Sequence, residues 1–334
     1  MSHYLKVRTC TERSVACLKG LSTGDAVGKQ TETLKREAIA KWYPSGVTGF
    51  HGELGTVIPR YVAKRYEWRV GETTDDTEQT LAVADALIHE EGVSHSGVGR
   101  RLMRCRKSNH AGVSLGQFQQ RGDPDVICLD GDGCGAAMRV APIGIVFRSE
   151  RLPDVIEAVF QASVPTHGGQ LALCAAAAVA AAVSAAVDGK SCEEVLKVGI
   201  GAARDAERIR PPSSAGNMAE ALGRMHSQLL AARDNLSARL QEEDCFPDRT
   251  AVIVPLAISL ALVTQSASET ILLATNIGGD TDSVASIGGG LAAAMFPQSV
   301  NDGWYEGVER VNNHKLVDVA VKLAALRGSD AACA

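Results

Sequence analysis

Residues 171–187 read LALCAAAAVAAAVSAAV and include no charged residue. A membrane-spanning helix needs about 20 predominantly apolar residues. This run is shorter, consists mostly of weakly hydrophobic alanine and has no Lys or Arg at its start. A helix that is apolar on all sides is typical of a protein core. We therefore expect residues 171–187 to form a central buried helix, whose small side chains let neighbouring helices approach closely.

The composition of the whole chain favours an all-α fold. Of its 334 residues, 45% are hydrophobic but only 4% are aromatic, whereas sheet proteins use more aromatic and β-branched residues. At about 150 residues per domain, the length allows two domains or one large one. We find no βαβ alternation, no repeat of fixed period and no composition step at a boundary. The sequence therefore predicts a single all-α domain over residues 1–334.

Hydrophobic periodicity predicts where the other helices lie. The expected helices cover residues 10–30, 77–91, 96–107, 152–162, 191–208, 217–241, 249–265 and 303–326. Ser191, with Glu194 three residues later, forms a capping-box pattern at the start of one of them. Residues 35–72 are predicted to be loop-rich because Gly and Pro recur there, and residues 112–135 are predicted to be irregular.

Charge and cysteine content restrict the class of partner and the compartment. With 34 Lys and Arg against 39 Asp and Glu, the net charge is −5, so the basic face that nucleic-acid binding requires is not expected. The nine Cys residues lack zinc-type spacing, and the start of the chain lacks an apolar leader segment. We therefore expect a cytoplasmic monomer with reduced thiols, no membrane association and no general nucleic-acid binding.

Two acidic motifs carry the first chemical signal. Residues 74–77 read TDDT, residues 280–283 read DTDS, and each motif lies at the start of a predicted helix. Asp and Thr are good N-cap residues, so helix capping is one interpretation. The motifs hold more carboxylates than a cap needs, however, and carboxylates that meet in space repel one another unless a cation lies between them. If the motifs fold together, their oxygens suit Mg²⁺ or Mn²⁺, with the hydroxyls of Thr74 and Ser283 as neutral donors.

Glycines surround the second acidic motif. Gly278 and Gly279 precede it, and residues 288–290 form a glycine triplet one to two turns into the following helix. Each helical glycine costs about 1 kcal/mol relative to Ala, so these positions indicate close approach of a ligand or of another helix. Tight helix packing is an open alternative for the triplet and is less expected for the pair.

Five motifs in order resemble the ADP-ribosylglycohydrolase family over nearly the whole chain. They are GLSTGDAVG at residues 20–28, TDDT at 74–77, GCGAAMRVAPIG at 133–144, TH at 166–167 and NIGGDTDS at 276–283. The family contains dinitrogenase reductase-activating glycohydrolase and the hydrolases of ADP-ribosyl-arginine and ADP-ribosyl-serine. The resemblance implies a compact, single-domain, all-α orthogonal helical bundle with a central metal cleft.

The resemblance also implies two divalent cations, Mg²⁺ or Mn²⁺, and a set of site residues. The implied metal ligands are Thr74, Asp75, Asp76, Asp280, Asp282 and Ser283. The implied catalytic residues are Asp75, Asp76, Asp282 and, from the serine-type branch, Glu32. The implied substrate contacts are Gly133, Cys134, Gly135, Met138, His167, Gly278 and Gly279. Ser283 stands where the family usually has Thr and Cys134 where several members have Asn. For His167, a buried imidazole satisfied by the backbone is the alternative.

The function implied is metal-dependent hydrolysis of the glycosidic bond at the anomeric carbon of an ADP-ribosyl group. The partner would be an ADP-ribosylated protein side chain or an ADP-ribosyl small molecule. Glu32 is the candidate for proton handling at the leaving atom or for gating access. One alternative is an N-glycosidase acting on a free nucleoside or nucleotide. Another is a non-catalytic, crystallin-like structural protein, against which the complete acidic set speaks.

Overall fold

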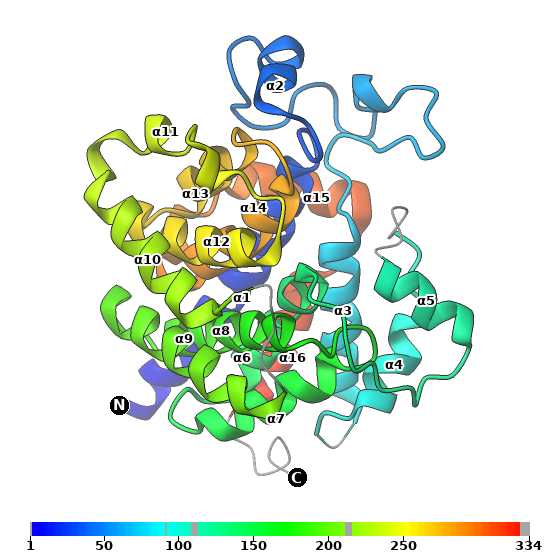
Figure 1. Cartoon of the computed structure of the whole chain (residues 1–334), viewed down its shortest axis with the longest axis vertical. Helices are drawn as coiled ribbons and strands as arrows, with labels where there is room; N and C mark the ends of the chain where they lie inside the picture. Colours follow the sequence, from blue (N-terminus) through cyan, green and yellow to red (C-terminus); the bar gives the residue numbers. More distant parts are fainter. Residues whose placement is uncertain (1, 91, 108–112, 211–215, 328–334) are drawn as a thin grey trace.

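The computed structural model describes residues 2–90, 92–107, 113–210 and 216–327. Helices account for 68% of the structure (Figure 1). The α-helices are α1 (Ser2–Gly28), α2 (Arg36–Trp42), α3 (Asp75–His89), α4 (His95–Leu102), α5 (Val113–Arg121), α6 (Ala141–Val146), α7 (Leu152–Ser163), α8 (Gln170–Val187), α9 (Cys192–Ala206), α10 (Met218–Ala231), α11 (Leu236–Arg239), α12 (Thr250–Thr264), α13 (Ala267–Thr275), α14 (Thr281–Met295), α15 (Asp302–Asn312) and α16 (Leu316–Leu326). The 3₁₀ helices are η1 (Pro59–Tyr61), η2 (Cys134–Arg139), η3 (Glu207–Ile209), η4 (Arg233–Asn235), η5 (Glu243–Cys245) and η6 (Pro297–Ser299).

The fold class agrees with the prediction. Within the ranges that the structure describes there is no β-strand, and the only pairing of that kind is an isolated bridge between Val57 and Arg69. The helices surround one large hydrophobic core to which most of them contribute buried side chains. The chain therefore has the all-α, compact architecture that its motifs and composition indicate.

Helix α8 lies in this core, as predicted. By length and composition alone it could cross a membrane, but 94% of the helix is buried inside the protein. Helices α6, α7 and α9 pack against it. Alanine side chains make this close packing possible, because they present little volume between neighbouring backbones. The interpretation as a buried core helix is confirmed.

Helices α1 and α14 pack together along glycines, and this contact settles the role of the glycine triplet. A Cβ atom at Gly20 would lie 2.6 Å from Ala293 Cβ, and one at Gly28 would lie 2.6 Å from Asp282 Cα. From the other helix, a Cβ at Gly289 would lie 2.9 Å from the carbonyl oxygen of Gly20. These distances leave no space for a side chain. The triplet therefore serves tight helix packing and not ligand approach.

Several predicted segments differ from the structure; among them, the helix expected over 96–107 ends at Leu102. Residues 112–135, expected to be irregular, contain helix α5, whose buried Leu115 and Phe118 face one side; a periodic pattern of nine residues is too short to stand out. The helix expected over residues 217–241 is divided into α10 and α11 by the turn η4. The helix expected over 303–326 is interrupted after Asn312, because Asn313 and Lys315 adopt left-handed φ values of 55° and 56°.

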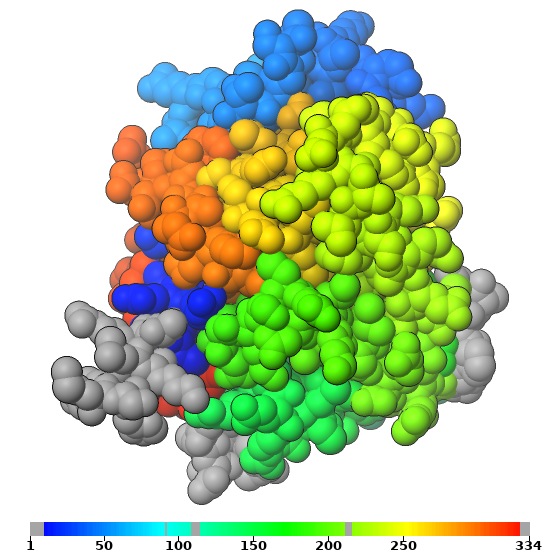
Figure 2. All heavy atoms as spheres, turned by 90° about the vertical axis from the view of Figure 1, so that its left-hand side faces the viewer, coloured from blue at the N-terminus to red at the C-terminus, as the bar shows by residue number. Residues whose placement is uncertain are grey.

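The capping box at the start of α9 is confirmed. Glu194 N–H donates to Ser191 Oγ at 3.3 Å, and Ser191 N–H donates to the Glu194 carboxylate at 2.9 Å. The loop-rich segment that carries α2 and η1 forms one end of the molecule (Figures 1 and 2). Ile58, Tyr61 and Trp68 give this segment a small hydrophobic cluster of its own.

Candidate active site

The first acidic motif begins helix α3 and is held there by helix α1. Thr74 is the N-cap of α3, and its hydroxyl accepts a hydrogen bond from Asp76 N–H at 3.2 Å. The buried carboxylate of Asp25 accepts bonds from Thr74 N–H at 2.9 Å and Thr77 N–H at 3.0 Å. The capping interpretation is therefore right for Thr74. We did not single out Asp25 from the sequence, although it is the acid within the first glycine motif.

The second acidic motif begins helix α14 and is not explained by capping. Asp280 occupies the N-cap position, but its side chain makes no capping hydrogen bond. Asp282 and Ser283 follow in the first turn and are both buried. The carboxylates of this motif do not cap the N-terminus of α14 and are therefore available to bind another group.

Gly278 and Gly279 shape the turn before α14. Their φ values of 87° and 73° lie in the left-handed region that favours glycine. A Cβ at Gly278 would lie 2.6 Å from Leu34 O, and one at Gly279 would lie 2.6 Å from Pro247 O. Neither glycine lines the cavity described below. In this structure the pair has a conformational role, because the protein backbone fills the space beside each glycine, and the substrate contact stays a prediction.

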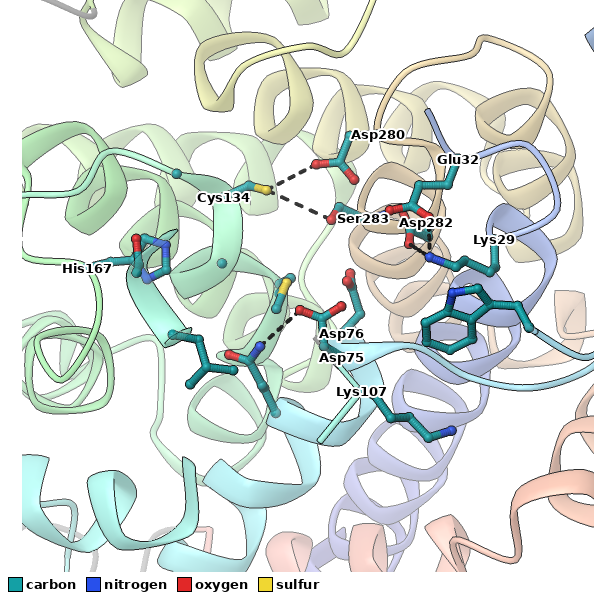
Figure 3. A pocket seen from close by; sticks show the side chains of 17 residues that line it. Lys29, Glu32, Asp75, Asp76, Lys107, Cys134, His167, Asp280, Asp282 and Ser283 are labelled. Atoms are coloured by element: carbon teal, nitrogen blue, oxygen red, sulfur yellow. Dashed lines mark hydrogen bonds and ion pairs between the residues drawn. The ribbon is translucent and has the colours of Figure 1, made fainter. Parts of the chain in front are cut away.

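Both acidic motifs line one cavity of about 300 Å³ (Figure 3). The residues that line it are Lys29, Glu32, Trp68, Asp75, Asp76, Gln79, Lys107, Ser114, Leu115, Gly133, Cys134, Gly135, Met138, His167, Asp280, Asp282 and Ser283. Lys29 and Glu32 lie at one end, His167 lies at the other, and Asp75 and Asp76 lie between them. Of the implied ligands and catalytic residues, Thr74 alone does not line this cavity, because its hydroxyl is used as the cap of α3.

The carboxylates of the cavity are costly to keep ionised. Burial raises the pKa of Asp75 to about 6. Burial, together with neighbouring carboxylates, also holds the pKa of Asp76 and that of Asp282 well above the usual value. Asp76 Oδ1 is buried and has no hydrogen-bond partner. Because buried charges need a compensating partner, this group of side chains favours the binding of a cation.

The oxygen atoms that line the cavity are suitable ligands for a hard divalent cation, but the side chains are not already positioned around one point. Mg²⁺ and Mn²⁺ prefer the carboxylate and hydroxyl oxygens that Asp75, Asp76, Asp280, Asp282 and Ser283 offer. Across the described part of the chain, however, no three His, Cys, Asp or Glu side chains are grouped so as to hold a metal ion. The unpartnered oxygen of Asp76 supports the fit, and the carboxylates would have to draw together around the ion.

A buried lysine supplies positive charge at one end of the cavity. Lys29 Nζ forms an ion pair with the Glu32 carboxylate and lies 3.9 Å from Asp282 Oδ2 (Figure 3). The hydroxyl of Tyr61 lies 3.4 Å from Glu32 Oε2 and donates to it. Glu32, the implied catalytic residue, is therefore held in place by Lys29 and Tyr61.

The glycine-rich motif of residues 133–144 forms the opposite wall, where Gly133, Gly135 and Met138 line the cavity. Cys134 Sγ donates to Asp280 Oδ2 at 3.2 Å and lies 3.9 Å from Ser283 Oγ. Burial, reinforced by the charge of Asp280, holds the pKa of the Cys134 thiol well above its usual value. Cys134 is therefore a neutral thiol that orients Asp280, not a reactive thiolate.

His167 enters the cavity as a neutral imidazole in one defined orientation. Burial, with the nearby charge of Arg139, lowers the pKa of His167 to about 3. Arg139 Nη2 donates to Thr166 Oγ1 at 2.8 Å, and Thr166 Oγ1 lies 2.8 Å from His167 Nδ1. The Thr166 hydroxyl can thus donate to Nδ1, which leaves the imidazole proton on Nε2, the nitrogen nearest Gly133. A side chain, and not the backbone, satisfies this histidine.

Several cavity residues were missed by the sequence analysis. They are Lys29, Trp68, Gln79, Lys107, Ser114 and Leu115. Lys29 could have been found, because it lies three residues before Glu32, within one turn. Gln79 lies one helical turn after Asp75 and donates to it at 3.1 Å. Nothing around Trp68 marked it, because it reaches the cavity from the loop-rich segment.

Comparison with known proteins relates the chain to one family. The sequence model of ADP-ribosylglycohydrolase matches residues 7–332. An uncharacterized protein of Escherichia coli K12, YegU, is 30% identical over 304 residues, which cover 85% of this chain and 88% of that protein. The ADP-ribosylarginine hydrolase Tri1 of Pseudomonas putida is 25% identical over 331 residues, which cover 91% of this chain and 78% of Tri1. A solved structure described as an ADP-ribosylglycohydrolase-related protein complex has a TM-score of 0.68 at 24% identity, over 96% of this chain and 99% of that one.

Proposed function

Because this chain belongs to the ADP-ribosylglycohydrolase family, we propose that it is a metal-dependent hydrolase of an ADP-ribosyl bond. The reaction is hydrolysis at the anomeric carbon of the proximal ribose, which releases ADP-ribose from a modified protein side chain or a small acceptor. The observation that carries the proposal is the convergence of Asp75, Asp76, Asp280 and Asp282 in one cavity beside the glycine-rich motif. The relative Tri1 is named for the arginine-linked reaction.

A bound Mg²⁺ or Mn²⁺ would orient the ribose and would stabilise negative charge on the oxygen atoms that it binds during hydrolysis. Asp75, Asp76, Asp280 and Asp282, with the Ser283 hydroxyl, are the cavity side chains that offer oxygen ligands for such ions. Their negative charge also stabilises the positive charge that develops at the anomeric carbon as the glycosidic bond breaks. This charge lies in a buried site, where electrostatic interactions are stronger than in water.

Glu32 and His167 act from opposite ends of the cavity. The Glu32 carboxylate, held by Lys29, accepts a proton from the water that attacks the anomeric carbon and passes a proton to the leaving atom. His167 presents Nε2–H beside Gly133 and Gly135, where it donates to an oxygen of the substrate. The proton removed from water is therefore returned to the acceptor, and the reaction is balanced.

The test is a hydrolysis panel with and without EDTA. It uses ADP-ribosyl-arginine, ADP-ribosyl-serine peptide and free nucleotide conjugates as substrates. Asp75→Asn and Asp282→Asn should abolish turnover while circular dichroism shows an unchanged fold. The matched control is Asp85→Asn, also on α3, since Asp85 is half-exposed and pairs with Arg101 outside the cavity. Full activity in either cavity variant, or activity indifferent to EDTA, contradicts the proposal.

One observation favours a second candidate, an N-glycosidase of a free nucleoside. The cavity of about 300 Å³ lies at the lower end of the usual range for small-molecule sites. The lining residues that the structure describes include Lys29 and Lys107 but no arginine, so the bidentate clamp that often holds a diphosphate is not among them. Hydrolysis of a free nucleoside, with no reaction on the ADP-ribosyl substrates, would favour this candidate over the first.

A further inference from the structure

The cavity contains a cation that belongs to the protein itself. Lys29 follows directly after α1, and its side chain is only 3% exposed. Its ammonium group is paired with Glu32 and lies 3.9 Å from Asp282 Oδ2. A lysine buried among carboxylates in this way neutralises charge at the Glu32–Asp282 end of the cavity.

Aromatic rings lie against this ammonium, and an arginine holds the neighbouring backbone. Lys29 Nζ lies 4.2 Å from the centroid of the Trp68 ring and 5.8 Å from that of Tyr61, distances at which a cation is attracted to the ring face. Arg60 donates to Gln30 O at 2.9 Å and to Glu32 O at 2.6 Å. The loop-rich segment is thereby attached to the backbone on both sides of Thr31, close to Lys29.

Lys29 already occupies the position that a cation at this end would take. Its ammonium lies within ion-pair distance of both the Glu32 and the Asp282 carboxylates, and the Trp68 ring lies against it. A divalent cation brought to the Glu32–Asp282 end would therefore meet a fixed positive charge at close range, and the two would repel each other.

Among the residues that the structure describes, the middle of the cavity has no ammonium group paired with its carboxylates in this way. Asp75, Asp76 and Asp280 line it, and Asp76 Oδ1 is the buried oxygen without a partner. Lys107 also lines the cavity, but its ammonium is engaged by Glu72 at 3.4 Å and by the carbonyl oxygen of Thr73 at 2.8 Å. The carboxylates for which the described residues provide no ion-paired cation are therefore concentrated on the Asp75–Asp76–Asp280 side.

We propose that the Lys29 ammonium takes the place of one of the two divalent cations that the family resemblance implies, so that the cavity binds a single divalent cation at the Asp75–Asp76–Asp280 side. This inference rests on the proposed metal-dependent function. It assigns Lys29 a role as a built-in cation beside Glu32 and Asp282. It also differs from the expectation of two metal ions in the sequence analysis.

The experiment counts bound Mn²⁺ on the full, metal-free protein by electron paramagnetic resonance of the free ion and by calorimetry. We expect one equivalent for the wild type and two for Lys29→Met, which removes the charge but keeps much of the side-chain volume. Lys29→Gln serves as the second neutral variant if Lys29→Met does not fold. Lys29→Arg, which keeps the charge, and Lys107→Met, which removes a cavity lysine already engaged elsewhere, should each bind one.

Two equivalents on the wild type, or one equivalent on a folded neutral variant, overturns the inference about Lys29 and leaves the proposed hydrolysis intact. No bound Mn²⁺ on any of these proteins overturns both the inference and the metal dependence of the proposed function. One equivalent on the wild type that rises to two when the charge of Lys29 is removed supports both. The count does not depend on activity, so the two failures are distinguishable.

Discussion

Helices α1 and α14 bring the acidic motifs together, and Gly24 gives the sharpest test of their contact. A Cβ at this position would lie 2.5 Å from the carbonyl carbon of Ala285 and 2.9 Å from Ser286 N. Both are backbone atoms, which no side-chain rotation can move. Gly24→Ala must therefore push the helices apart. Asp25, the next residue, holds Thr74 N–H, so the start of α3 would be displaced as well.

The size of the effect follows from two opposing contributions. Overpacking a core costs about 1–3 kcal/mol and sometimes more, while Ala in place of Gly gains about 1 kcal/mol within a helix. Because the clash at Gly24 is with main chain, we expect Gly24→Ala to lower the free energy of unfolding by about 2 kcal/mol or more. The matched control is Gly201→Ala in α9, where no heavy atom lies within 4 Å of the added Cβ. It should raise the free energy of unfolding by up to about 1 kcal/mol.

Urea unfolding followed by far-ultraviolet circular dichroism measures both changes. A shift in the midpoint at constant slope reports stability alone. A midpoint for Gly24→Ala equal to that of the wild type would refute the close contact between α1 and α14. A loss of stability in Gly201→Ala would show instead that any substitution of a helical glycine is harmful in this protein.

Three further predictions concern other parts of the molecule. Burial raises the pKa of Asp75 to about 6, so its native carboxyl binds a proton more tightly than the unfolded one, and this contribution to stability is lost as pH rises through 6. With EDTA present, Asp75→Asn should therefore stabilise the protein more at pH 7 than at pH 5. Thermal unfolding measured at both pH values checks this, and an equal effect at the two would contradict the raised pKa of Asp75. Arg327→Met should cost about 3 kcal/mol or more in urea unfolding, because it leaves the carboxylate of Asp188, 2.7 Å away, without its partner; an unchanged midpoint would mean that the pair is not formed. Ser191→Ala should cost about 1 kcal/mol by removing the cap that Glu194 N–H uses, whereas Ser191→Asp should retain most of the stability.

Local patterns were sufficient to predict much of the fold. The charge-free alanine run predicted α8 and its burial, and the Ser191–Glu194 spacing predicted the start of α9 with its capping box. Such features depend on neighbours within one or two turns, so a single sequence contains them. The single helix expected over residues 303–326 failed because it depended on the left-handed conformations of Asn313 and Lys315, which periodicity does not reveal.

The candidate site also has a part that the sequence predicts and a part that depends on tertiary packing. Asp75, Asp76, Asp280 and Asp282 could be recognised from the sequence, because several carboxylates in a short motif are chemically conspicuous. Helix packing, by contrast, determines which glycines lie against backbone, that Asp25 holds the start of α3, and that Lys29 lies among the carboxylates. These are contacts between residues far apart in the chain or across a turn, and their distances follow from how whole helices pack. The number of cations that the carboxylates need therefore depends on the packed structure, although the carboxylates themselves are visible in the sequence.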